Sequence, residues 1–109
     1  MDAIWAAPQN HKVLYEDDKV RIMEVTVKSR EMQSMHHHRW PSVLMIDSYP
    51  KHNNHLIDGR VIPEERPAAD RPFPLVVSRG PTPPHAVENL DTIPFHLYSV
   101  EFKKIEFRN

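Results

Sequence analysis

Four histidines are the residues of this 109-residue chain that could most readily do chemistry together. Three are consecutive, at positions 36–38, and His85 follows a rigid diproline. Residues i and i+2 of a β-strand point to the same face, so His36 and His38 should project together while His37 points the other way. Neutral imidazole is a common protein ligand for zinc, iron, nickel and copper. We therefore expect His36, His38 and His85 to bind one divalent metal ion: Fe, Ni, Zn or Mn.

The alternative is that the histidine triplet is a polar run on the surface. The neighbouring sequence favours a site, because Met35 and the apolar run from Val43 to Ile46 place the triplet beside a buried strand. Ligating imidazoles must be neutral, so such a site should release its metal as the pH falls below about 6.

Short β-strands separated by turn signals account for most of the chain. Alternating or continuous apolar runs with β-branched residues predict strands, and Asp58-Gly59 between two of them is a hairpin signal because glycine accepts a positive φ. The proline-rich segment from Pro63 to Pro74 predicts a loop, and residues 80–84 predict a rigid turn. The expected strands are His11–Tyr15, Lys19–Lys28, Met35–His38, Ser42–Asp47, His55–Ile57, Arg60–Ile62, Leu75–Ser78, His85–Asn89 and Phe95–Phe107.

This pattern predicts an all-β fold, either a sandwich or a closed barrel. No stretch has helical periodicity, and the length fits one domain over residues 1–109. Residues 1–10 are expected to be an N-terminal arm that docks through Trp5 and its apolar neighbours, and a loose terminus is the alternative.

The arrangement of the histidines resembles that of a small cupin. The first cupin motif is G-x5-H-x-H-x3,4-E-x6-G, and residues 36–38 fit its H-x-H core. The second is G-x5-P-x-G-x2-H-x3-N, and residues 85–89 fit its H-x3-N, with 80–84 where the motif has glycine and proline. Residues 91–101 also resemble the closing hairpin of small bacterial cupins. The likeness covers roughly Lys12 to Lys103 and implies a double-stranded β-helix, or jelly-roll, barrel.

The chain departs from these motifs in ways that change the expected chemistry. The motif glutamate should fall at position 42 or 43, where Ser42 and Val43 stand, and most motif glycines are missing. The resemblance therefore implies a three-histidine site with open coordination positions, as in some cupin dioxygenases, which suits an anionic substrate. It implies oxygen-dependent cleavage of a small carbonyl or carboxylate metabolite if the protein is an enzyme. A degenerate or empty site in a non-catalytic, ligand-binding or dimerising barrel is the alternative.

Four further residues are candidates for the site. Tyr98 and His96 are candidate catalytic groups if their face of the last strand lines the cavity. Trp40 is a candidate wall of the ligand site, and Asn89 a candidate hydrogen-bonding partner of a ligand; ordinary packing and turn roles are the alternatives for each. His52 and His55 are expected at the surface.

Composition excludes several classes of function. A formal net charge of −1 with scattered basic residues argues against a nucleic-acid partner. There are no cysteines, so thiolate ligands and disulfides are excluded. No apolar run is long enough to cross a membrane, and we expect a cytoplasmic protein. The expected partners are a small molecule and a second copy in a homodimer.

Overall fold

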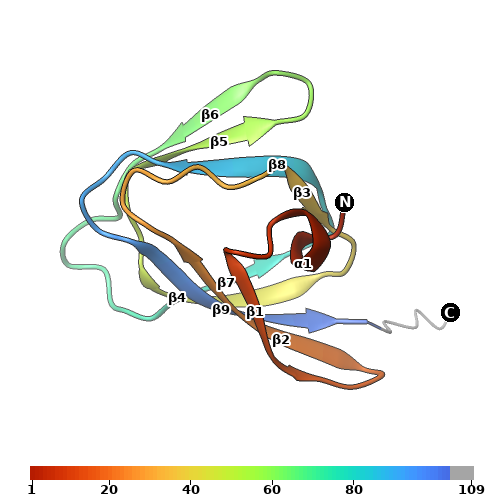
Figure 1. Ribbon diagram of the computed structural model, residues 1–109. Helices are drawn as coiled ribbons and strands as arrows, with labels where there is room; N and C mark the ends of the chain where they lie inside the picture. Colours follow the sequence, from red (N-terminus) through yellow and green to blue (C-terminus); the bar gives the residue numbers. More distant parts are fainter. Residues whose placement is uncertain (104–109) are drawn as a thin grey trace, which may run out of the picture.

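The computed structural model describes residues 1–103, and nearly all of its regular structure is β-strand (Figure 1). The strands lie close to the predicted ranges, and the end of the expected last strand, from residue 104 to Phe107, lies outside the described residues. The elements in chain order are α1 (Ala3–Ala6), β1 (His11–Glu16), β2 (Val20–Val27), β3 (His36–His38), β4 (Ser42–Ser48), β5 (His52–Leu56), β6 (Val61–Glu64), β7 (Leu75–Arg79), β8 (Thr82–Asn89) and β9 (Phe95–Phe102).

Two antiparallel sheets face each other, as Figure 1 shows. One has five strands in the order β1-β2-β9-β4-β7, and the other has four in the order β3-β8-β5-β6. The predicted hairpin between β5 and β6 is confirmed: Gly59 has φ +91°, and the Gly59 amide donates to the Leu56 carbonyl at 3.0 Å. The predicted all-β jelly roll is therefore the observed architecture.

Strand β8 begins earlier than the sequence suggests. It includes Pro83 and Pro84, which were expected in a turn. The ladder between β3 and β8 is irregular at this point, because His36 lies opposite His85 while His38 lies opposite Thr82. Proline is tolerated where a ladder is interrupted, since no amide donor is needed there.

The apolar core lies on the inner face of the five-stranded sheet. Strands β2, β4 and β9 each alternate buried and partly exposed residues, as expected for strands covered on one side. Burial of these side chains is the main favourable contribution to folding. The buried core residues are Met23, Val25, Val27, Leu44, Ile46, Phe95 and Leu97.

The N-terminal arm docks on the barrel through backbone contacts, the buried Ala3 and Ile4, which packs against the core. Asp2 forms a bridge with His37, whose amide donates to the Met1 carbonyl at 2.8 Å. Ala3 is fully buried, whereas Trp5 is 86% exposed. The expected docking is thus observed, but Trp5 does not carry it. The arm also contains α1, a single helical turn that the sequence pattern did not indicate.

A largely buried ion network joins the N-terminal arm to β2 and β9. The Arg21 Nε donates to a Glu101 carboxylate oxygen at 2.6 Å, and its two terminal nitrogens donate to the Asp2 carboxylate at 3.0 and 3.1 Å. Arg21 and Glu101 are both buried. Asp2 also caps α1, because its side chain accepts from the Ile4 amide at 3.2 Å.

Removing the cation from this network should be strongly destabilising. Arg21→Met leaves the Glu101 carboxylate buried without its partner, which costs about 3–5 kcal/mol of unfolding free energy. Arg60→Met is the matched control, since the ion pair of Arg60 with Asp58 is exposed on both sides and should contribute little. Urea denaturation of the two variants measures the difference, and equal losses would contradict the prediction.

Candidate metal centre

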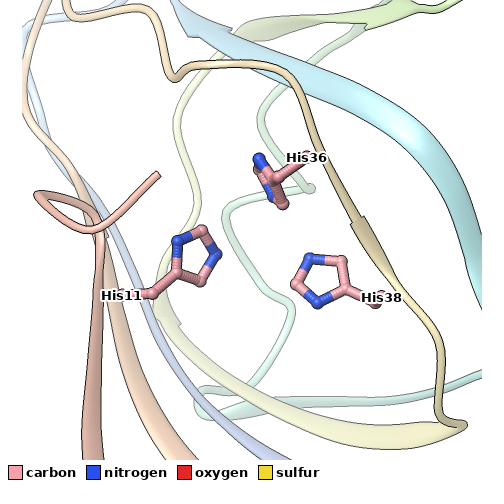
Figure 2. Close-up of side chains that lie close together, drawn as sticks. All are labelled: His11, His36 and His38. Carbon is pink, nitrogen blue, oxygen red and sulfur yellow. The ribbon is translucent and has the colours of Figure 1, made fainter. Parts of the chain in front are cut away.

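Three buried histidines converge between the two sheets. His11 comes from the start of β1, and His36 and His38 come from β3, as Figure 2 shows. One ring nitrogen of each lies within 4.8 Å of the others. An ion with metal–nitrogen distances of about 2.0–2.1 Å keeps its ligand nitrogens no more than about 4.2 Å apart. The rings would therefore close by less than about 1 Å each on binding.

Strand pairing directs these side chains into the interior of the barrel. His36 lies directly opposite His85 in the ladder between β3 and β8, and residues directly opposite share a face. His11 lies opposite Val25, a core residue of β2. The expected alternation in the triplet is observed: His36 and His38 are buried, while His37 is half-buried and lies against the N-terminal arm.

Backbone carbonyls orient two of the three imidazoles. The His11 Nδ1 lies 3.0 Å from the Ala7 carbonyl, and the His36 Nδ1 lies 2.8 Å from the Ser34 carbonyl. A carbonyl only accepts, so each Nδ1 carries the proton and each Nε2 presents a lone pair. Hydrogen bonds of this kind fix the tautomer and ring direction of metal-binding histidines.

The third imidazole faces a carboxylate. The His38 Nδ1 lies 3.6 Å from a Glu101 oxygen, which is too long for a hydrogen bond. Both atoms are buried, and neither has a hydrogen-bond partner within residues 1–103. A small closing movement would let the His38 Nδ1–H donate to Glu101, giving a carboxylate–histidine pair of the type that supports metal ligands.

His85 lies beside this group and was predicted to belong to it. Its ring centroid is 4.8 Å from that of His36 and 5.6 Å from that of His38. Its Nδ1 donates to the Asn54 side-chain oxygen at 2.9 Å, which leaves its Nε2 as a lone pair that is buried without a partner. The structure therefore brings together His36 and His38 as predicted, adds His11, and leaves His85 next to the group as a candidate fourth ligand.

Burial keeps these histidines neutral. Desolvation lowers the pKa of His11 and of His36 to about 4. It also lowers the pKa of His38, and it holds the pKa of His85 well below the usual range, with neighbouring imidazoles adding to the effect. Metal ligation needs the neutral form, so proton competition should begin nearer pH 4 than the pH of about 6 expected for ordinary histidines.

The histidines form one side of a cavity of about 130 Å³. The opposite side is apolar and comes from the core residues of β2, β4 and β9. Polar groups from other strands complete the wall. The lining residues are His11, Val25, Val27, Gln33, His36, His38, Leu44, His52, Asn54, Arg79, His85, Val87, Phe95, Leu97 and Ser99.

Two predicted catalytic residues lie on the wrong face of β9. The cavity is lined by Phe95, Leu97 and Ser99, so His96 and Tyr98, which alternate with them, point to the outer face. There His96 contacts Glu24 at 2.7 Å and Asp47 at 2.5 Å. The assumption that their face lines the cavity is therefore corrected.

Trp40 and Asn89 are not among the residues that line this cavity. The Trp40 ring packs under the Arg39 guanidinium, 4.1 Å from the ring centroid, and lines a separate surface groove beside the arm. The Asn89 amide donates to the backbone carbonyls of Val27 and Ile93 at 3.0 and 2.9 Å, so it holds a turn. By contrast, His52, which was expected at the surface, is buried and lines the cavity.

Solved structures with the same fold are similar to this chain throughout most of its length. A cupin domain from Bordetella pertussis Tohama I is 15% identical, with a TM-score of 0.71 over 86% of this chain and 92% of that one. An RmlC-like cupin family protein from Methanocaldococcus jannaschii is 13% identical, with a TM-score of 0.59 over 84% and 77%. The polyketide cyclase RemF from Streptomyces resistomycificus is 15% identical, with a TM-score of 0.58 over 91% and 68%.

These likenesses show that the chain has the cupin double-stranded β-helix fold, which confirms the predicted resemblance at the level of fold. In the sequence comparisons, no protein-family model and no curated protein matches the chain. None of the helices in the described part of the chain has the length and hydrophobicity needed to cross a membrane.

Metal-free protein should lose stability as the pH falls from about 6.5 to about 4. Unfolded imidazoles titrate near pH 6.5, whereas His11 and His36 titrate near 4 in the folded state. The unfolded chain therefore binds more protons than the folded chain in this window. The free energy of unfolding decreases as the pH decreases. Urea denaturation in EDTA at several pH values measures the slope.

The variant His11→Gln isolates the contribution of the cavity to that slope. It removes one buried imidazole and should make the dependence shallower. His96 acts in the opposite direction, because burial lowers its pKa but hydrogen bonds to Glu24 and Asp47 raise it overall. The comparison of wild type with His11→Gln cancels that effect, and identical slopes would show that His11 is not buried in its neutral form.

Proposed function

We propose that this protein binds a divalent metal ion between His11, His36 and His38, with His85 as a fourth neighbour, and uses it on a small anionic metabolite. The observation that carries the proposal is the convergence of three buried imidazoles, one ring nitrogen of each lying within 4.8 Å of the others. Backbone carbonyls hold the Nδ1 atoms of His11 and His36, and the Nε2 of the adjacent His85 is buried without a partner in the described residues. Imidazole donors suit Fe, Ni and Zn, and also Mn when positions remain for oxygen ligands.

The donor set supports catalysis as well as binding. Neutral histidines leave the charge of a divalent ion uncompensated, and such an ion polarises a bound carbonyl or carboxylate oxygen. The cavity limits the ligand to a small molecule, because about 130 Å³ is close to the volume that holds one benzene. A polyketide, the substrate class in the name of one similar structure, does not fit this volume.

The reaction class we propose is dioxygenase-like cleavage of a small carbonyl or carboxylate compound. Its support is the resemblance of the histidine pattern to three-histidine cupin dioxygenases together with the apolar wall of the cavity. The Ala7 and Ser34 carbonyls would orient the ligating imidazoles of His11 and His36, and the apolar wall would exclude bulk water. Oxygen uptake that requires both added metal and His36 is the corresponding assay.

Metal uptake should depend on the converging histidines and not on their outward neighbour. Untagged protein should take up about one equivalent of Zn²⁺ or Fe²⁺ at pH 7, and His36→Ala or His38→Ala should weaken binding by on the order of 10–100-fold or more. His37→Ala is the matched control, since His37 lies against the N-terminal arm and should leave uptake unchanged. Equilibrium dialysis with elemental analysis gives the stoichiometry and affinity.

Two further variants define the ligand set. His11→Ala and His85→Ala, measured in the same way, show whether three or four imidazoles hold the ion.

Uptake should also persist to about pH 5, because the pKa of His11 and of His36 is near 4. Uptake equal to the control in both His36→Ala and His38→Ala, or none in the wild type, would contradict the proposal.

A non-catalytic binding protein is the second candidate. The apolar half of the cavity, formed by residues such as Val25, Leu44 and Leu97, could hold a metabolite without a metal. Thermal stabilisation of EDTA-treated protein by a small carboxylate, with no turnover after metal is restored, would favour this function over catalysis.

We also propose that the homodimer expected from the sequence forms through β1. This strand lies at the edge of the five-stranded sheet and exposes Val13, Leu14 and Tyr15, and an edge with apolar side chains readily pairs with another chain. Light scattering should give twice the monomer mass for the wild type and a monomer for Leu14→Glu. A monomeric wild type at high concentration would contradict it.

A further inference from the structure

The cavity contains a cation that the proposed metal site does not use. Arg79 is the last residue of β7, and it lies opposite Ser42 of β4, which in turn lies opposite Glu101 of β9. Glu101 lies opposite Arg21 of β2. These four side chains form one row across the inner face of the sheet, with Arg79 at the end that lines the cavity.

Arg79 makes no ion pair in this row, and Glu101 attracts it only from a longer distance. Both oxygens of Glu101 are directed elsewhere, one to Arg21 at 2.6 Å and the other toward His38. In the described part of the chain, no carboxylate lies within 4 Å of the Arg79 guanidinium, and its Nε is buried without a hydrogen-bond partner. Arginine stays protonated in proteins, so a positive charge without a close counter-ion lies in the wall of this cavity.

A second unpartnered donor lies in the same cavity. The Ser99 hydroxyl is buried, has no hydrogen-bond partner among residues 1–103, and lines the cavity with Arg79. Buried polar groups in native proteins normally have partners, and an orphaned one calls for an explanation such as a missing ligand. A guanidinium binds a carboxylate through two parallel hydrogen bonds, and a hydroxyl can add a third.

We propose that Arg79, assisted by Ser99, binds the carboxylate of a small monocarboxylate ligand in this cavity. The ligand's other end then faces the histidines; that second contact rests on the proposed function, whereas the carboxylate contact does not. A cavity of about 130 Å³ accommodates about six non-hydrogen atoms, by comparison with a 150 Å³ cavity that holds benzene. A short 2-oxo acid meets these limits: one carboxylate, an apolar tail and a carbonyl oxygen.

The probe is pyruvate, compared with its neutral analogue pyruvamide. Both have six non-hydrogen atoms, so the comparison isolates the negative charge. Chemical-shift titrations are made on EDTA-treated and on metal-loaded protein. Wild type should prefer pyruvate, and Arg79→Gln should weaken pyruvate binding by about thirty-fold or more, as expected when one partner of a buried charge pair is removed.

Two variants guard against a trivial loss of binding. Arg79→Lys keeps the charge but not the two parallel hydrogen bonds, so it should bind pyruvate less tightly than wild type and still prefer it to pyruvamide. This variant decides the matter if Arg79→Gln does not fold. Arg60→Gln, at an exposed arginine, is the matched control and should bind like wild type.

The outcomes separate this proposal from the metal proposal. Equal binding of pyruvate and pyruvamide, no binding of pyruvate by either form, or pyruvate binding by Arg79→Gln equal to that of Arg60→Gln would overturn the role of Arg79. Arg79-dependent binding in a protein that takes up no metal would support the carboxylate site and refute the metal site. Metal uptake together with pyruvate binding that does not depend on Arg79 would support the metal site and refute the carboxylate site.

Discussion

The buried ion pair between Arg21 and Glu101 connects the elements that orient two of the clustered histidines, His11 and His38. Glu101 is fully buried, and its second oxygen faces the His38 Nδ1. Arg21 also binds Asp2, which caps α1. The residue after α1 supplies the carbonyl that accepts from His11. The orientations of His11 and His38, which come from different strands, therefore both depend on one guanidinium.

Burial favours metal binding here by keeping the ligands in their neutral form. An imidazole that lost water without a partner would normally be costly, and the cavity limits this cost by satisfying one ring nitrogen of His11, His36 and His85 with an oxygen acceptor. The other nitrogen stays available. The apolar wall on the opposite side raises the cost of protonation, so the same packing that forms the core also keeps the lone pairs free.

Local sequence patterns were enough to predict the strands, the hairpin at Gly59, and the shared face of His36 and His38, because each depends on a period of two or on a single turn. They did not predict which face of β9 lines the cavity. That strand carries large side chains on both faces, including Phe95 and Tyr98, and its orientation is set by its pairing with β2 and β4. The long-range pairing of β9 therefore places His96 and Tyr98 on the face away from the cavity.

His11 was missed because spacing along the chain does not reveal it, although the hairpin between β1 and β2 places it opposite the inward-facing Val25. The missing motif glutamate has a related consequence. Position 42, one of the two where that glutamate is expected, holds Ser42, which lies directly opposite Arg79. A glutamate there would lie beside the guanidinium, whereas serine leaves the guanidinium without a close ion pair. The same departure from the motif thus leaves both a histidine cluster without that carboxylate and a guanidinium without a close counter-ion, and both favour an anionic ligand over a neutral one.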